Sequence, residues 1–180
     1  MIEIEQLTKI YKLNKKQQKE MKIKDTQKVA VSDLSLTAKE GEIFGLLGTN
    51  GAGKTTTLRC LATLLQPTSG RILVNGFDTV KDGKKVREQI GFLTNEMKLD
   101  PHFSPNYLVD FFGRLHGLEE NVIKKRKQEL FEYFGINEFA EKRVEELSTG
   151  MKQKASIAVS LIHDPQVVIF DEPTTGLDII

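Results

Sequence analysis

The sequence predicts an α/β fold with buried parallel strands and a largely helical second half. A short apolar segment runs into a glycine-rich loop that is followed by an amphipathic helix. The run VVIF at 167–170 is fully apolar, as is typical of a parallel strand buried on both faces. From 104 to about 163, apolar residues recur with the helical period. Together these three observations indicate strands that alternate with helices.

Composition and charge exclude several classes of protein. The chain has 180 residues, of which 39% are hydrophobic and 28% charged. These values are ordinary for a globular domain and exclude a disordered tail or a fibre. No apolar run approaches the roughly 20 residues that cross a bilayer. The net charge of +1 gives no sign of nucleic-acid binding, and the single cysteine, Cys60, fits a reducing compartment.

The first forty residues predict two strands separated by a basic insert. Residues 2–10 and 29–38 both alternate between apolar and polar residues, as strands do. Residues 9–28 contain only two acidic residues, Glu20 and Asp25, against eight lysines, at positions 9, 12, 15, 16, 19, 22, 24 and 28. We expect residues 12–28 to be exposed and mobile. They form either a solvated loop or hairpin tip, or a contact with anionic lipid headgroups or a partner.

Further elements are expected before residue 95. Cys60 falls inside a predicted amphipathic helix and is expected in the core. The predicted elements are a short buried strand at about 42–47, a helix at 54–65, a strand at 71–74 with a turn at Asn75-Gly76, a charged helix at 80–89 and a strand at 90–94.

The second half predicts helices. Ser104 and Pro105 are start signals for a helix, and a further helix at 149–163 ends at Asp164-Pro165. The apolar stripes expected to face the core are Leu108, Phe111, Phe112 and Leu115 in one helix, and Ile123, Leu130 and Phe134 in the next. The histidines, which are expected at the surface or at helix ends, are His102, His116 and His163.

The strongest motif is a phosphate-binding loop at residues 48–55, GTNGAGKT. It matches the P-loop pattern of Gly, four residues, Gly, Lys and Ser or Thr, and it lies between a strand and a helix as that pattern requires. Glycines let backbone N–H groups approach phosphate oxygens, and the helix N-terminus adds its positive dipole end. Lys54 is expected on the β- and γ-phosphates and Thr55 on Mg²⁺. The residues expected to bind the nucleotide here are Gly48, Asn50, Gly51, Ala52, Gly53, Lys54, Thr55 and Thr56.

Two carboxylates follow the apolar strand at 167–170. Asp171 and Glu172 stand at its C-terminal end, where ligands bind in doubly wound sheets. Asp171 is expected to hold Mg²⁺, and Glu172 is the candidate base that polarises the attacking water. Together with the phosphate-binding loop, this pair predicts a P-loop NTPase.

A third motif carries a family resemblance. LSTGMKQ at 147–153 resembles the signature sequence of ATP-binding cassette (ABC) proteins, and TTGLD at 174–178 resembles their D-loop. The phosphate loop, signature, acidic strand and D-loop occur in the family's order and cover essentially the whole chain. Thr149 stands where the family has its second signature glycine, and Met151 where it has glutamine.

The resemblance implies further site residues. Ser148 and Gly150 would cover the γ-phosphate held by a second cassette, and Ser148 also suits the cap of the following helix. Tyr11 would stack on adenine, although a tyrosine packed beside a strand remains the alternative. Asn95 takes the place of the family's metal-contacting glutamine and is one methylene shorter, so neighbouring Glu96 is the alternative.

The resemblance also implies a function. It implies a RecA-like core with an antiparallel β portion, and an ATPase subunit that uses ATP and Mg²⁺. The subunit would pair head to tail with a second ATPase subunit and drive a transmembrane permease from the cytoplasmic face of the membrane. Export is expected, with sodium as the candidate cargo because LSTGMKQK at 147–154 resembles the sodium-export branch. Nucleic acid is not expected as a partner.

The domain boundaries and the alternatives complete these expectations. Residues 1–94 and 166–180 are predicted to form the nucleotide-binding core of a single cassette, and residues 95–165 its helical signature subdomain. The chain stops two residues after Asp178, so we expect an incomplete cassette with weak ATPase activity. The alternatives are a catalytically weak nucleotide-binding module and an ABC ATPase outside transport.

Overall fold

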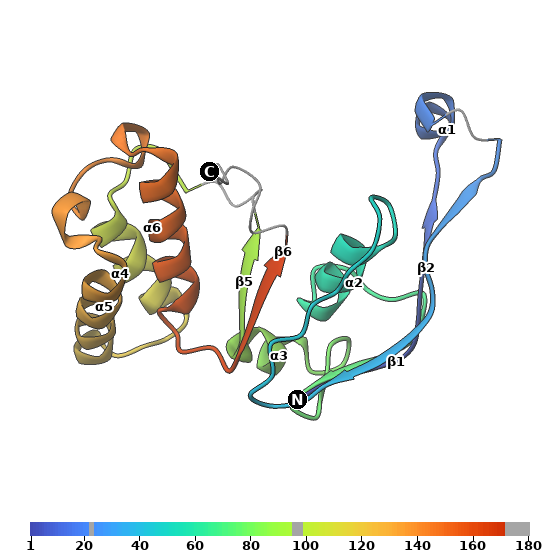
Figure 1. Ribbon diagram of the computed structural model, residues 1–180, viewed down its shortest axis with the longest axis horizontal. Coiled ribbons are helices and arrows are strands. Elements are labelled where there is room, and N and C mark those ends of the chain that lie inside the picture. Colours follow the sequence, from blue (N-terminus) through green and yellow to red (C-terminus); the bar gives the residue numbers. More distant parts are fainter. Residues whose placement is uncertain (22–23, 95–98, 172–180) are drawn as a thin grey trace. The chain divides into compact units, whose positions relative to one another are not determined.

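The computed structural model describes residues 1–21, 24–94 and 99–171 and consists of two compact units, Met1–Arg87 and Glu88–Ile180 (Figure 1). The strands at 90–94 and 167–171 pair with each other and therefore lie in the second unit. The predicted division into a nucleotide-binding core and a signature subdomain remains a prediction. Among the described helices, none has the length and apolar character needed to cross a bilayer.

The first unit is built on an antiparallel sheet of order β2-β1-β3-β4. Both predicted N-terminal strands are confirmed, and each is longer than expected. The turn at Asn75-Gly76 is also confirmed, because both residues have positive φ and Val74 pairs with Phe77 across it. The strands are β1 (Ile2–Lys12), β2 (Gln27–Ala38), β3 (Ser69–Val74) and β4 (Phe77–Asp78).

The basic insert carries a short helix, α1 (Lys15–Met21), at the end of the β1–β2 hairpin (Figure 1). Sequence analysis did not predict this helix, because seven residues with no apolar stripe give no periodic signal. The described lysines of residues 12–28 are exposed, as expected, whereas the mobility of this segment stays a prediction. Lys9 lies in β1, as the strand predicted at 2–10 requires, and its ammonium donates to the Gln66 carbonyl at 2.7 Å.

The predicted strand at 42–47 is wrong, because residues 42–49 have no regular secondary structure. A strand needs a neighbour for its backbone N–H and C=O groups, and neither described sheet includes this segment. The side chains of Ile43, Phe44 and Leu47 are accordingly exposed, and that of Leu46 is half-buried.

Two further helices are α2 (Lys54–Leu61), in the first unit, and α3 (Gly83–Gln89), whose last two residues belong to the second unit. The helix expected at 54–65 ends early because Thr63 adopts positive φ, a conformation that terminates helices. The helix expected at 80–89 starts late because the Asp78 carboxylate accepts the N–H groups of Val80 and Lys81 in a preceding turn. Cys60 is buried as predicted, and burial raises the pKa of its thiol.

The second unit packs three helices around an apolar core, beside the parallel pair β5 (Ile90–Thr94) and β6 (Val167–Asp171). The helices are α4 (Pro105–Leu115), α5 (Glu120–Phe134) and α6 (Thr149–Leu161), with 3₁₀ turns η1 (Asn137–Phe139) and η2 (Val144–Glu146). Ser104 caps α4 by accepting the Tyr107 N–H, as predicted. The core residues are Leu108, Val109, Phe131, Ile136, Phe139, Val144, Leu147, Ala158, Val159 and Ile162.

The apolar stripe predicted for α4 is only partly correct. Leu108 is buried and Phe112 packs against the core, but Phe111 and Leu115 are exposed. The buried face is formed instead by Pro105, Leu108, Val109 and Gly113, because Ile123 of α5 packs closely against Gly113. The stripe predicted for α5 is confirmed, with Ile123 buried and Leu130 and Phe134 packed against the core.

Two histidines stack where α4, α6 and β5 meet. The rings of His116 and His163 are parallel, with centroids 3.9 Å apart. His163 Nε2 donates to the Ile90 carbonyl at 3.1 Å, which leaves Nδ1 buried without a hydrogen-bond partner. Burial lowers the pKa of both rings, and the proximity of His116 lowers the pKa of His163 further, while Glu88 partly opposes the shift at His116.

We expect the stability of this chain to fall as the pH drops below about 6.5, the ordinary pKa of histidine. The unfolded state takes up protons at that pH before the folded rings do, so folding stability is lost as the pH falls. The urea midpoint should therefore drop between pH 7.5 and 5.5, and His116→Gln should reduce that drop. The difference should stay below about 1 kcal/mol, because the His116 ring is partly exposed and solvent screens its charge. His102→Gln is the control, and an equal effect from it would contradict this role.

Candidate functional site

The phosphate-binding loop begins the site in the first unit. Gly53 caps α2 with φ 89°, and the loop carbonyls of Gly48 and Thr49 accept the Lys54 ammonium at 2.8 and 2.9 Å. The lysine therefore folds back over the loop from the first turn of the helix. The loop thus brings a cation, a helix N-terminus and glycine backbone together at one place, which is the chemistry that binds phosphate.

Gly53 is the tightest point of this loop. A Cβ atom there would lie 2.3 Å from the Ala30 carbonyl oxygen and 2.9 Å from Val31 Cγ2, both in β2. Gly51 also has positive φ, at 84°, but a Cβ atom there would meet nothing within 4 Å. Gly53 therefore fixes the start of α2 against the sheet, whereas Gly51 needs only conformational freedom.

We expect Gly53→Ala to destabilise the chain by more than Gly51→Ala does. Both substitutions impose the left-handed conformation on alanine, at a cost of about 1–2 kcal/mol. Only the first adds a collision with backbone that cannot move without shifting β2. Urea unfolding of both variants measures this difference, with Gly45→Ala as a control because Gly45 has open space and no positive φ. Equal losses at 51 and 53 would contradict the packing argument.

Tyr11 lies near the end of β1, opposite Lys28 of β2, and is half-buried. The Lys9 ammonium lies 5.4 Å from the centroid of its ring and is itself held by the Gln66 carbonyl. Lys9 therefore helps to fix the orientation of Tyr11. The sequence alone did not indicate this role, because Lys9 is one of many lysines in this part of the chain. Stacking of Tyr11 on adenine remains a prediction.

The signature segment lies in the second unit, at the start of α6. Ser148 accepts the Met151 N–H at 3.3 Å, so the predicted helix cap is confirmed. Residues 148–150 are exposed, and a Cβ atom on Gly150 would meet nothing within 4 Å. Packing within the described part of this chain therefore does not require a glycine at position 150. The open space there allows another molecule to approach the backbone of Gly150 closely.

The acidic strand ends in the same unit. Asp171 is the last residue of β6, is paired in parallel register with Thr94 of β5, and is buried. Asp171 and Ser148 thus belong to the second unit, and the phosphate-binding loop and Tyr11 to the first. Glu172, Asn95, Glu96 and the motif at 174–178 lie outside the described residues.

The chain is similar in sequence to known ATP-binding proteins of the ABC transporter family. The family profile described as ABC transporter matches residues 31–175. The ABC transporter ATP-binding protein NatA of Bacillus subtilis is 48% identical over 161 residues, which are 88% of this chain and 65% of NatA. The linearmycin resistance ATP-binding protein LnrL of the same species is 40% identical over 84% of this chain and 49% of LnrL. The chain thus spans about half to two thirds of the length of these relatives.

Solved structures show the same fold. The ABC transporter cassette MJ0796, described as dimeric, matches with a TM-score of 0.82 and 26% identity over 99% of this chain and 76% of that cassette. A second structure of MJ0796, a dimeric post-hydrolysis state bound to ADP and Pi, matches equally well. The predicted α/β P-loop NTPase fold is therefore confirmed.

Proposed function

Because the chain belongs to the ABC transporter family, we propose that it is the ATP-binding and ATP-hydrolysing subunit of an exporter whose permease is a separate chain. The observation that carries this proposal is the phosphate-binding loop, with Lys54 poised on the Gly48 and Thr49 carbonyls. In this proposal the chain acts at the cytoplasmic face of the membrane, and ATP binding and hydrolysis by paired subunits change the state of the permease.

Lys54 would exchange partners when ATP binds. Its ammonium now contacts two neutral carbonyl oxygens, whereas the β- and γ-phosphates offer charged acceptors, which make hydrogen bonds about twice as strong. The backbone N–H groups in the first turn of α2 have no acceptors within the helix and suit the same phosphates. The loop therefore needs little rearrangement to bind a nucleotide.

The donor set fits Mg²⁺. The Thr55 hydroxyl and the Asp171 carboxylate are the hard oxygen ligands that Mg²⁺ prefers. Among the described residues, no three His, Cys, Asp or Glu side chains are arranged to hold a metal by themselves, which suits an ion that takes its remaining ligands from phosphates and water. We propose Thr55 and Asp171 as its protein contacts, with Asn95 or Glu96 as a further one. When bound, the ion would offset the phosphate charge.

A second copy of the subunit completes the proposed site. Ser148 and the N-terminus of α6 are exposed and suited to an anion. We propose that they cover the γ-phosphate held by the partner cassette, in a head-to-tail dimer. The open space at Gly150 and the dimeric form of MJ0796 support this arrangement.

The permease contact is proposed on α4. Phe103, Tyr107 and Phe111 form a ladder of stacked rings, with successive centroids 4.4 and 6.2 Å apart. All three side chains are exposed, as is Leu115 one turn further along the helix. Helical spacing places Tyr107, Phe111 and Leu115 on one face of α4, and the ring of Phe103, which precedes the helix, stacks on Tyr107. Such an exposed apolar stripe is typical of an interaction site.

The experiment that tests the transporter role is co-purification from membranes. We expect the tagged chain to retain a permease and the double variant Tyr107→Ser, Phe111→Ser to lose most of it, while ATP affinity is unchanged. Tyr133→Ser is the control, because Tyr133 is 84% exposed on α5 but outside this ladder. Equal retention by the double variant would contradict the docking face, and absence of any permease would contradict the transporter role.

Sodium is the proposed cargo, resting on the resemblance of residues 147–154. Sodium efflux from cells carrying the complete transporter, compared with cells carrying its Lys54→Ala variant, tests this. Equal efflux would contradict it.

A nucleotide-binding module with little turnover is the second candidate. The irregular conformation of residues 42–49, which precede the phosphate-binding loop, favours it. ATP binding without measurable phosphate release by the isolated chain would support this candidate.

A further inference from the structure

The β1–β2 hairpin extends beyond the sheet of the first unit. The last pair between β1 and β3 is Thr8 with Ser69, whereas β1 continues to pair with β2 as far as Lys12 and Gln27. Past Thr8 the hairpin is therefore a two-stranded ribbon, and α1 lies at its end (Figure 1). We call residues 10–28 the basic arm.

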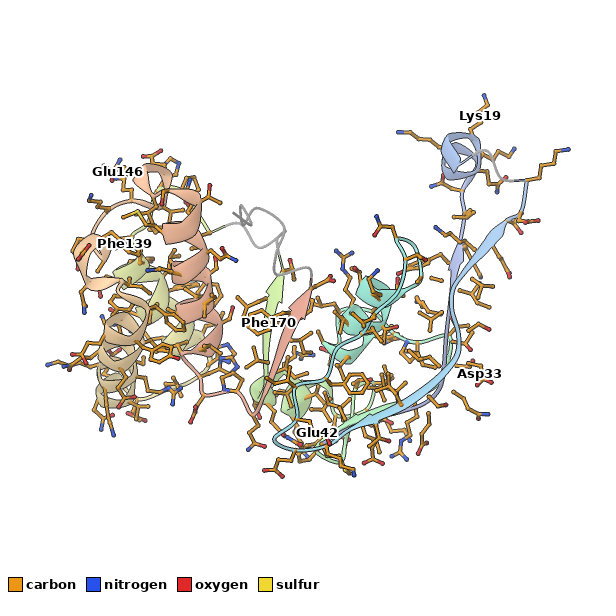
Figure 2. All side chains as sticks on the ribbon, in the orientation of Figure 1. Lys19, Asp33, Glu42, Phe139, Glu146 and Phe170 are labelled. Carbon is orange, nitrogen blue, oxygen red and sulfur yellow. The ribbon has the colours of Figure 1, made fainter. Side chains whose placement is uncertain are left out.

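The basic arm concentrates positive charge. Residues 12–28 hold seven lysines against Glu20 and Asp25, a net charge of +5 in a chain whose total is +1. The lysine at the tip, Lys19, extends away from the ribbon in Figure 2. The described lysines of this segment, all exposed, are Lys12, Lys15, Lys16, Lys19, Lys24 and Lys28.

The chemistry of the arm favours a diffuse anionic surface over a specific ligand. All its basic residues are lysines, which act as compact point charges and lack the planar fork with which arginine grips a single carboxylate or phosphate. Its one aromatic residue, Tyr11, lies at the base of the arm with the Lys9 ammonium 5.4 Å from its ring centroid. Residues 12–28, which carry the lysines of the arm, contain no aromatic side chain on which the bases of a nucleic acid could stack. Val29, at the edge of the arm, adds an apolar side chain that is 57% exposed.

We propose that the basic arm binds the anionic headgroup surface of a membrane. Each lysine near such a surface strengthens binding about fivefold, so several weak contacts add up without a shaped pocket. This contact would be independent of nucleotide and would hold the ATPase against the bilayer beside its permease. Because binding is measured without ATP or a permease, its outcome is separate from that of the proposed function.

The test is flotation of the whole chain with phosphatidylcholine vesicles that contain or lack phosphatidylserine. We expect binding only to the vesicles with phosphatidylserine, and a steep loss of binding as salt rises from about 0.1 M towards 1 M, where the Debye length falls from about 10 to about 3 Å. The triple variant Lys15→Gln, Lys16→Gln, Lys19→Gln should bind roughly a hundredfold more weakly. The matched control is Lys124→Gln, Lys125→Gln, Lys142→Gln, which removes the same charge from exposed positions in the second unit.

A second variant separates charge from the folding of α1. Lys24→Gln, Lys28→Gln leaves the helix unchanged and should still weaken binding by at least about tenfold. The proposal would be overturned if the chain bound neutral vesicles equally well, or if binding did not change with salt concentration. An equal loss of binding in the control variant would also overturn it. Binding of duplex DNA in preference to phosphatidylserine vesicles would overturn it as well and assign the arm to nucleic acid.

Discussion

Replacing Lys54 by alanine is expected to weaken ATP binding by about ten- to a hundredfold. Hydrogen bonds to charged groups contribute about 1.5–3 kcal/mol each, and about 1.4 kcal/mol is a tenfold change in affinity. Lys54 is the side-chain cation of residues 48–55, so the remaining contacts to phosphate come from backbone and hydroxyl groups. Calorimetric titration with MgATP measures this loss directly.

Two controls separate the lost charge from damage to the loop. The Lys54 ammonium also holds the Gly48 and Thr49 carbonyls, so alanine frees both of them. Lys54→Met keeps most of the side-chain volume without the charge and should bind ATP as weakly as the alanine variant. Lys39→Ala removes an exposed lysine elsewhere in the first unit and should bind normally. Unchanged affinity in both Lys54 variants would refute the phosphate-binding role.

The elements that sequence predicted well are those with a local signal. Residues 90–94 and 167–170 lie in strands as expected, because a short run of apolar and β-branched residues bounded by turn residues indicates a strand even when its partners are unknown. The expected burial of residues 167–170 on both faces is wrong, since Val168 and Phe170 are exposed. The caps at Ser104 and Ser148 are also local, since each side chain bonds to an N–H three residues later. The phosphate-binding loop belongs to this class, because its glycines and lysine act within eight residues.

The errors come from contacts that are distant in the sequence. Periodicity predicted that Phe111 faces the core, but the close packing of Ile123 against Gly113 makes a different face of α4 the buried one. The apolar composition of residues 42–47 predicted a strand, but a strand also requires a neighbour. Lys9 looked like part of a charged insert until the strand register placed its ammonium on Gln66.

In the candidate site, the motif residues could be predicted from the sequence, whereas the contacts that hold them in place could not. Residue types and spacing predicted which side chains take part, because phosphate and Mg²⁺ chemistry restricts the choice to a few types. They did not predict that Gly53 is fixed by the backbone of Ala30 in β2, or that Tyr11 is oriented by Lys9. Such supporting contacts join segments far apart in the chain and have no signature in a single motif.

Replacing Glu172 by glutamine is expected to leave ATP binding within about twofold and to slow hydrolysis by about a hundred- to ten-thousandfold, the usual contribution of a general base. Glu172 follows Asp171 directly in the chain and lies outside the described residues. Glutamine keeps the size and polarity of the side chain but has no negative charge with which to polarise water. Single-turnover measurements with labelled ATP detect the change even where turnover is slow.

The contrast with Lys54→Ala makes the Glu172 assignment specific. Loss of the lysine lowers affinity, whereas loss of the carboxylate lowers the rate of the chemical step at saturating ATP, so the two variants fail in different measurements. Glu145→Gln is the matched control, because Glu145 is an exposed carboxylate paired with Arg143 at 3.6 Å on the surface of η2. If Glu172→Gln hydrolysed bound ATP at the parental rate, the base would have to be another carboxylate.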